Sequence, residues 1–244
     1  MKYIASVSFG KDSLAAIICR MEHGEPIDGA VYCRIMFDDS ISAELPEHEE
    51  FIHETAIPLL QSRYGIKTTI VQSEVTYCGQ FYTRYIKGSK AGNFYGFPLF
   101  IGSWCNDRLK IRPIEKWQKT AGEHTAIIGI AADEGKRLDR KISKNKILPL
   151  VDYGINEAEA FDICRQAGLL SPAYNDGRTR LGCWFCHFQR ISELRRLRKE
   201  HPHLWKRLLD MEPDSFRTFK PKNISLLKLD RRFEDEDAQL TLFD

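Results

Sequence analysis

The chain has 244 residues, of which 43% are hydrophobic and 29% charged, and its net charge is +2. This composition is typical of a soluble globular protein, and no apolar run approaches the ~18 residues that a membrane span requires. The N-terminus lacks the basic and apolar regions of a signal peptide, so we expect a cytoplasmic protein whose seven cysteines are reduced, metal-bound or reactive.

The first predicted element is a buried strand over residues 3–7, which leads through the segment Ser-Phe-Gly-Lys-Asp-Ser at 8–13 into an apolar helix. N–H groups in the first turn of a helix lack intrahelical partners, and the helix dipole favours negative charge there. The glycine permits close approach of a phosphate, while the hydroxyls and the lysine add donors. The segment therefore indicates an anion site with a spacing unlike the Walker-type loop, the alternative being an ordinary strand-to-helix turn.

Strand-like and helix-like segments alternate along the first two thirds of the chain, as in a parallel sheet with helices on both faces. After Cys186 the strands cease, and residues 191–209 predict two basic helices separated at His201-Pro202. We therefore predict an α/β fold with a small helical C-terminal appendage. The further predicted strands cover residues 29–37, 66–71 and 125–130. One predicted helix starts at Pro46, and another covers residues 157–166 and stops at Gly168.

A dense group of aromatic residues occupies residues 76–104 and is interrupted by Gly88, Gly92, Gly96 and Gly102. The glycines favour a loop or lid over a site, whereas large aromatic side chains more often belong to a core. Both interpretations stay open at this point.

Charge is distributed unevenly along the chain. Residues 178–232 hold 15 Lys and Arg against 6 Asp and Glu, whereas residues 233–244 hold five acids and no base. We predict a nucleotide-binding domain over residues 1–182 and a second part over 183–244, with the C-x-x-C motif, basic helices and an acidic tail. The basic helices, with Arg190, Arg195, Arg196, Arg198 and Lys199, suit a nucleic-acid backbone, although a solvated basic helix has the same composition.

Further motifs follow in order: Asp38-Asp39 with Leu45-Pro46-Glu47, Trp104-Cys105 with Lys110, the segment 128–134 with Arg137, and the segment 174–186, which ends in Cys183-Trp184-Phe185-Cys186. Together with residues 8–13 they resemble the ATP-pyrophosphatase (PP-loop) superfamily, whose fold is the adenine nucleotide alpha-hydrolase-like one. Within it they resemble the phosphoadenylyl-sulfate (PAPS) reductase family, closest to its DNA-phosphorothioation and phage-borne branch.

The resemblance implies that the 8–13 loop holds the pyrophosphate end of ATP. It implies catalytic roles for Lys11, Asp12, Lys110 and Arg137, with Asp12, Asp38 or Asp39 meeting Mg²⁺. The nucleotide-binding residues that it implies are Ser8, Phe9, Gly10, Lys11, Asp12, Ser13, Asp38, Asp39 and Gly129. Ala131 stands where the family often has an arginine and Gly135 where it often has a serine, so Lys136 or Arg140 would substitute, or the substrate differs.

The cysteines near the second half of the chain indicate a metal centre. Cys105, Cys183 and Cys186 would hold a [4Fe–4S] cluster with one open iron, or a Zn²⁺ completed by His187. Cys78 is a further candidate ligand or reactive thiol, and structural cysteines are the plain alternative. Cys19, Cys33 and Cys164 lie on apolar faces, so we predict that they are core residues.

Three functions fit these patterns. The first is an enzyme that cleaves ATP to AMP and pyrophosphate and adenylates an acceptor for sulfur transfer, with a sulfur donor such as a cysteine desulfurase and with nucleic acid among the acceptors. The second is reduction of adenylyl sulfate or PAPS, although no cysteine follows Cys186 to act as the tail nucleophile of that chemistry. The third is a nucleotide-binding module without turnover.

Overall fold

The computed structural model describes residues 1–139, 145–175 and 177–240. The chain divides into two compact units, the first with residues 1–34, 44–73 and 110–181 and the second with residues 35–43, 74–109 and 182–244. The boundary at 182/183 stays a prediction, because the second unit also takes in two segments from the first half of the chain.

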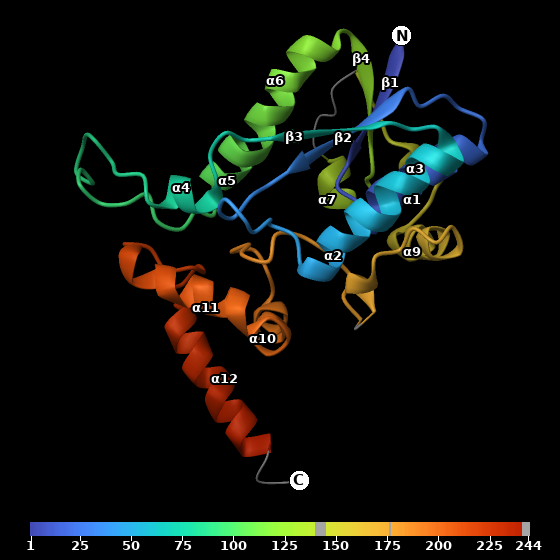
Figure 1. Cartoon of the computed structure of the whole chain (residues 1–244). Helices are drawn as coiled ribbons and strands as arrows, with labels where there is room; N and C mark the ends of the chain where they lie inside the picture. Colours follow the sequence, from blue (N-terminus) through green and yellow to red (C-terminus); the bar gives the residue numbers. More distant parts are fainter. Residues whose placement is uncertain (140–144, 176, 241–244) are drawn as a thin grey trace. The chain divides into compact units, whose positions relative to one another are not determined.

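The first unit is built on a five-stranded parallel sheet with the order β3-β2-β1-β4-β5 (Figure 1). The predicted α/β class is therefore confirmed. The strands are β1 (Lys2–Val7), β2 (Gly29–Arg34), β3 (Thr68–Gln72), β4 (His124–Ile128) and β5 (Lys146–Ile147).

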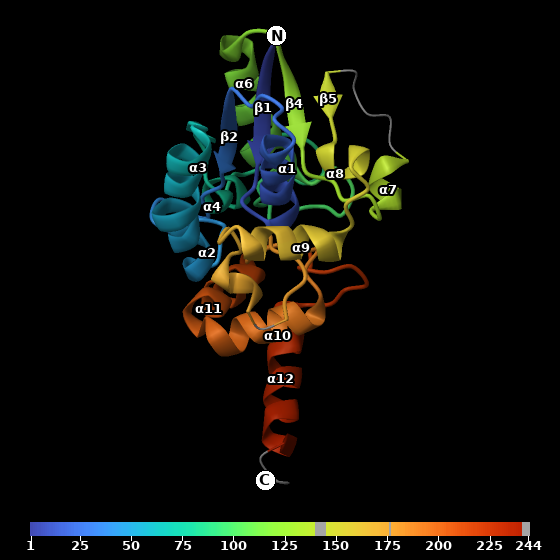
Figure 2. The same ribbon diagram turned by 90° about the vertical axis from the view of Figure 1, so that its right-hand side faces the viewer.

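Helices cover both faces of this sheet. Figures 1 and 2 show α1 and α3 on one face and α6 on the other, which follows from the reversal of strand order between β3 and β4. The helical elements of the unit are α1 (Lys11–Glu22), α2 (Pro46–Glu50), the π-helical η1 (Phe51–Ala56), α3 (Ile57–Tyr64), α6 (Arg112–Ala121), α7 (Gly135–Leu138), α8 (Pro149–Asp152), α9 (Glu157–Gln166) and the 3₁₀-helical η3 (Pro172–Tyr174).

Most predicted elements are confirmed, with two informative differences. The second strand ends at Arg34 rather than at 37, and beyond it Met36 forms only an isolated antiparallel bridge to Ser42. Strand β5 was not predicted, since two residues are too few to show a periodicity. The helix at 157–166 has the predicted bounds because Asn156 and Glu159 form a capping box at its start.

The strand register places two loops side by side. Ser6 on β1 pairs with Ile128 on β4, so both strands end at the same level and lead directly into Ser8 and Gly129. The strand order reverses between β1 and β4: from β1 the chain proceeds to β2 and β3 on one side of the sheet, and then returns to β4 and β5 on the other side of β1. In open α/β sheets, ligands bind outside the carboxyl ends of the strands at such a switch point.

The second unit is helical and has an aromatic core. Its elements are α4 (Tyr77–Phe81), α5 (Trp104–Asn106), α10 (Ile191–Glu200), α11 (Pro202–Met211), the 3₁₀-helical η4 (Glu212–Asp214) and α12 (Leu226–Leu240), while the π-helical η2 (Asp107–Ile111) spans the border between the units. Tyr77, Phe81, Phe97 and Trp104 are buried, so the core interpretation holds for these members of the aromatic stretch. Among the described residues, no helix combines the length and apolarity needed to span a membrane.

Candidate nucleotide-binding site

The loop between β1 and α1 contains a strained residue. Phe9 has φ of +57°, a left-handed conformation that is unusual for a bulky side chain, and it is fully buried. Its ring packs edge-on against Tyr32 with the centroids 5.1 Å apart. Such strain persists only where the surrounding structure fixes it, and it clusters at functional sites.

Two serines close this loop. The Ser13 hydroxyl donates to the Gly10 carbonyl (2.9 Å) and accepts from the Ser8 N–H (3.2 Å), while the two serine hydroxyl oxygens lie 3.3 Å apart. Ser13, in the first turn of α1, therefore fixes the position of Ser8 directly after β1.

Gly129 makes the closest backbone approach at the site. A Cβ atom placed on Gly129 would lie 2.4 Å from the Asp12 carbonyl oxygen and 2.6 Å from the Ser13 Cα. These are backbone atoms that cannot turn aside, so the end of β4 packs on the start of α1 only because residue 129 is glycine.

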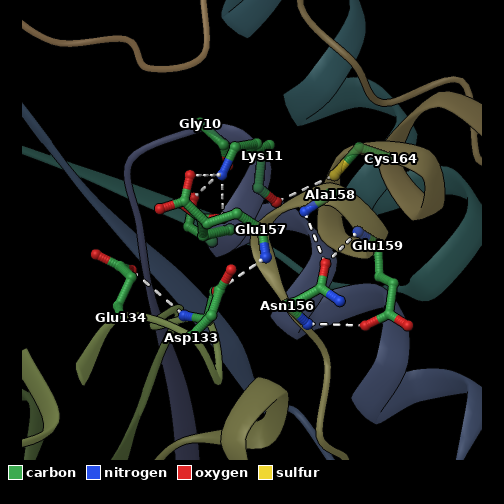
Figure 3. Close-up of polar contacts among 12 residues, drawn as sticks. Gly10, Lys11, Asp133, Glu134, Asn156, Glu157, Ala158, Glu159 and Cys164 are labelled. Carbon is green, nitrogen blue, oxygen red and sulfur yellow. Dashed lines mark hydrogen bonds and ion pairs between the residues drawn. The ribbon is translucent and has the colours of Figure 1, made fainter.

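The Lys11 ammonium lies between two carboxylates, as Figure 3 shows for Glu157. It is 2.7 Å from Asp12 Oδ1 and 3.1 Å from Glu157 Oε2, and the lysine is 5% exposed. Glu157 is the first residue of α9, and its own N–H donates to Asp133 Oδ1 at 3.1 Å. Lys11 after β1, Asp133 after β4 and Glu157 after β5 are thus connected, with Glu157 in contact with both of the others.

Burial and charge perturb both partners of this pair. Burial lowers the pKa of Lys11, but the bonds and charges of Asp12 and Glu157 outweigh it, so the Lys11 pKa is raised above its ordinary value. Burial raises the pKa of Asp12, and although Lys11 acts against this, the Glu134 and Glu157 charges add to it, so the Asp12 pKa is also raised. Burial and neighbouring carboxylates thus both act against the charged form of Asp12.

Arg137, the second predicted phosphate partner, lies on α7. Its guanidinium donates to the Glu134 oxygens at 2.9 and 3.0 Å and is 45% exposed, while Glu134 Oε1 accepts from the Ala131 N–H at 3.3 Å. The Lys136 side chain and Arg140, predicted as substitutes for the missing arginine at 131, lie outside the described residues.

Tyr174 completes the start of α1. Its hydroxyl accepts from the Lys11 N–H at 3.0 Å in a buried contact, and a Cβ at Gly10 would lie 3.4 Å from the same oxygen. Tyr174 belongs to η3, whose first N–H groups are capped by the hydroxyl of Ser171 (3.3 Å from Ala173 N). The tyrosine therefore reaches the loop from a short, capped helix.

His48 supports this arrangement from α2. Its Nδ1 lies 2.9 Å from the Ser171 hydroxyl, and the side chain also bonds to the Ser8 backbone. The residue is 1% exposed, and burial lowers its pKa to about 4, so its ring is neutral at pH 7. His48 thus connects the end of β1 to the segment that carries Tyr174.

Lys110 stands at the edge of this network. It is exposed, and its charge acts on the mostly buried Glu44, whose carboxylate lies 3.9 Å from His48 Nε2. Burial raises the pKa of Glu44 to about 7, with Glu49 adding to the shift and Lys110 opposing it. No contact of the Lys110 ammonium with the loop is recorded within the described residues.

Asp38 and Asp39 belong to the second unit, so their predicted role with the loop stays a prediction. Asp38 Oδ1 accepts from the Ser40 and Ile41 N–H groups at 2.9 and 2.8 Å, and its other oxygen pairs with Arg207. Although burial acts to raise it, these bonds and the Arg207 charge lower the pKa of Asp38.

The cysteines of the second unit surround one aromatic cluster. Cys78 follows Tyr77, Cys105 follows Trp104, and Cys183 and Cys186 bracket Trp184 and Phe185. The Tyr77 ring lies 5.0 Å from that of Trp104 and 4.3 Å from that of Phe185, and all four thiols act electrostatically on its hydroxyl. The C-x-x-C segment is anchored by Trp184, whose indole N–H donates to the Ser42 carbonyl at 2.8 Å.

These thiols are not preassembled around an ion. Within residues 1–139, 145–175 and 177–240, no group of three or more His, Cys, Asp or Glu side chains is arranged to hold a metal. Burial raises the pKa of Cys105 and of Cys78 to about 11, so both are protonated at pH 7. His187 Nε2 lies 3.3 Å from the Ser103 hydroxyl, and burial lowers the pKa of this histidine to about 4.

Arginines of the predicted basic helix are bound within the second unit. Arg195 donates to Glu236 and Asp237 at 2.6 and 2.7 Å, and Arg198 donates to Asp230 and Asp237 at 2.7 and 2.9 Å. Residues 233–240 of the predicted acidic tail therefore belong to helix α12, and Glu236 and Asp237 pair with Arg195 and Arg198.

Several residues of the site were not among those predicted for it. Glu157 and Asn156 carry a recognisable signal, because an Asn-x-x-Glu pattern opens a helix. His48 carries none, since a lone histidine in a helix does not show which loop it will contact. The buried Cys19, Cys33 and Cys164 are core residues as predicted, and Cys164 donates to the Lys11 carbonyl at 3.1 Å.

Comparison with known proteins adds no functional name. No family model matches the chain. An uncharacterised protein of Methanocaldococcus jannaschii is 23% identical over 216 residues, covering 84% of this chain and 40% of that protein. An uncharacterised nin region protein of Escherichia phage lambda is 40% identical over 62 residues, covering 24% of this chain and 21% of its own length. The chain thus spans less than half of either relative.

Proposed function

We propose that this protein is a cytoplasmic PP-loop enzyme of the PAPS reductase type, which cleaves ATP to AMP and pyrophosphate and adenylates an acceptor for sulfur transfer. The observation that carries the proposal is the switch point between β1 and β4, where a strained loop, the start of α1 and Gly129 meet. The seven free thiols agree with a reducing compartment. The adenine nucleotide alpha-hydrolase-like fold, with its C-terminal basic appendage, belongs to the same proposal.

The loop supplies what a polyphosphate needs. N–H groups of the first turn of α1 face outward from the helix start, and the helix dipole adds partial positive charge. Lys11 is held at the loop by two carboxylates, so it would neutralise phosphate oxygens only after a Mg²⁺ ion bound with the nucleotide takes over at least one of them. Arg137, exposed on α7, is the second cation that we assign to the phosphates, and Lys110 the third.

The carboxylates around Lys11 fit a magnesium ion that arrives with the nucleotide. Mg²⁺ is usually bound by one or two carboxylates together with substrate phosphates and water. Asp12 has the chemistry for this, and a bound cation would oppose the burial and the Glu134 and Glu157 charges that together raise its pKa. Asp38 and Asp39 remain further candidates for the same ion.

The proposed reaction needs positioning more than covalent help from the protein. An acceptor oxygen attacks the α-phosphorus, the bond between the α- and β-phosphates breaks, and pyrophosphate leaves with that electron pair. The acceptor is then bound to AMP, a good leaving group that a sulfur nucleophile displaces. The protein orients the triphosphate and stabilises the charge that develops on it.

For the second unit we propose a [4Fe–4S] cluster, with a single zinc ion completed by His187 as the alternative. Cys105, Cys183 and Cys186 would hold the cluster, and it would supply sulfide for thiolation, formed from the persulfide of a donor such as a cysteine desulfurase with two electrons from a thiol reductant. The four thiols share one aromatic cluster, yet no three are arranged around an ion in the described chain, so cluster binding would have to draw them together and release their protons.

The test is pyrophosphate release from Mg-ATP labelled at the α-phosphate, with Lys11→Ala beside Lys67→Ala, an exposed lysine of the same unit, as a matched control. We expect labelled AMP rather than ADP, and a loss of ATP affinity of about tenfold to a hundredfold in K11A only. Equal ATP affinity in the two variants would contradict the proposal. Sulfite formed from adenylyl sulfate would instead identify a reductase.

A further inference from the structure

The second unit has a concave surface that the proposed reaction does not use. It is a hollow of about 430 Å³ between the segments 98–100 and 216–223, and none of the described residues that line it is acidic. Its wall combines Leu99, Phe100 and Phe216 with Arg217, Lys220 and Lys222. Hollows of this size accommodate small molecules or single groups of a larger ligand.

Aromatic surface is exposed at this hollow. Two large apolar side chains of the wall are exposed, Phe216 to 43% and Leu99 to 48%. Two cations flank the Phe216 ring, with the Arg217 guanidinium carbon 4.3 Å and the Lys90 ammonium 5.3 Å from its centroid. An exposed ring beside cations offers a stacking surface next to positive charge, which suits a neutral planar group attached to an anion.

Two cations of the wall, Arg217 and Lys220, are bonded to neutral groups, and burial lowers the pKa of Lys220. Arg217 donates to the carbonyls of Tyr95 and Phe97 (3.1 and 3.2 Å) and to the hydroxyl of Tyr85 (3.2 Å), all of which are neutral acceptors. The Lys220 ammonium likewise donates to the carbonyls of His187 (2.9 Å) and Gln189. These bonds fix the two side chains without neutralising them.

Lys222 projects from a tight turn at the rim. Lys222 and Asn223 both have positive φ, +60° and +57°, and the turn is closed by the antiparallel bridge between Lys220 and Ile224. Asparagine favours this conformation, whereas lysine adopts it at a cost. Because glycine or asparagine would form this turn at less cost, the turn by itself does not account for a lysine at position 222.

This surface contrasts with α10, whose arginines the sequence suggested for a nucleic-acid backbone. On α10, Arg195 and Arg198 are paired with carboxylates of α12, so their charge is compensated inside the unit. At the hollow, no carboxylate of the described chain forms an ion pair with the wall cations Arg217, Lys220 and Lys222 or with Lys90 beside Phe216. Positive charge available to a polyanion is thus found at the hollow.

We propose that this hollow binds single-stranded nucleic acid, with a base against the Phe216 ring and backbone phosphates on Lys222 and Lys90. Single-stranded nucleic acid combines stacking faces with phosphates, and proteins bind it through aromatic side chains in positively charged grooves. The inference goes beyond the proposed ATP chemistry and does not depend on it.

The experiment measures fluorescence anisotropy of a fluorescein-labelled single-stranded oligonucleotide of mixed sequence, titrated with the full chain at several salt concentrations. We expect Phe216→Ala to weaken binding by roughly tenfold or more, because stacking on one aromatic residue is lost. Lys222→Glu should weaken binding and also flatten its salt dependence. Lys199→Glu, an equal charge change on an exposed lysine of α10, should leave affinity unchanged.

Unchanged affinity in both F216A and K222E, or a loss confined to K199E, would overturn the proposal. Preference for an acidic peptide over the oligonucleotide would overturn it as well. Thermal unfolding of each variant checks that the fold is kept, and Lys222→Gln with Lys90→Gln supplies a milder pair if K222E unfolds. Lys11→Ala should bind the oligonucleotide normally, so failure of the ATP proposal and failure of this one are separable.

Discussion

The two chemistry-bearing regions of this protein are built in different ways. At the switch point of the first unit, geometry comes from the backbone: Ser6 pairs with Ile128, Phe9 turns left-handed, and Gly129 touches the start of α1. In the second unit, the thiols are placed by the packing of aromatic neighbours, and the described residues contain no ready metal group. The loop of the first unit is therefore shaped by the backbone, whereas the thiols that we propose as cluster ligands are not arranged around an ion in the described chain.

The largest expected change in stability concerns the aromatic packing of the second unit. Trp184→Ala should lower the free energy of unfolding by about 3–5 kcal/mol, because it empties a fully buried position and removes the bond to Ser42. Urea unfolding measures this, with Phe188→Ala, a 61% exposed aromatic four residues later, as the matched control. A loss of the same size in F188A would show that aromatic packing at Trp184 is not special.

The next prediction tests the backbone-built region. Gly129→Ala should cost about 3 kcal/mol, since its Cβ would overlap backbone atoms of Asp12 and Ser13. Gly135→Ala is the control, because a Cβ there meets nothing within 4 Å. Urea unfolding compares the two. If G129A were as stable as G135A, the close approach of β4 to α1 would not be a constraint.

Acid should destabilise the first unit through His48. Its folded pKa of about 4 lies below the ordinary value of 6.5, so the unfolded chain takes up the proton first. Stability is then full above about pH 6.5 and is lost as the pH falls toward 4, by roughly 3 kcal/mol at most. His48→Gln should flatten that part of the stability profile, whereas the exposed His203→Gln should leave it unchanged.

The smallest effect concerns the ion pairs that join α10 to α12. Arg198→Ala should cost about 1 kcal/mol, because its side chain is 23% exposed and water screens the lost pairs. The cost should shrink at high salt. Lys206→Ala, which breaks an exposed pair within one helix, is the comparison and should be nearly neutral. An R198A cost independent of salt would point to packing instead.

Local patterns in the sequence were sufficient for most of the elements. The apolar run before Ser8 predicts β1, Asn156 and Glu159 predict the start of α9, and His201-Pro202 predicts the break between α10 and α11. Each of these signals acts within a few residues of where it is read. The loop 8–13 was found for the same reason, because a strand, a glycine and a helix start are contiguous.

Contacts between distant segments were decided only by the tertiary structure. Glu157 meets Lys11, His48 meets Ser171, and two carboxylates of the acidic tail, Glu236 and Asp237, pair with arginines of α10. A count of charges along the chain cannot show which of them neutralise one another, because ion pairs form through space. The sequence by itself determined four of the five strands and the loop at 8–13, because these signals are local, while folding through space determined which charges neutralise one another.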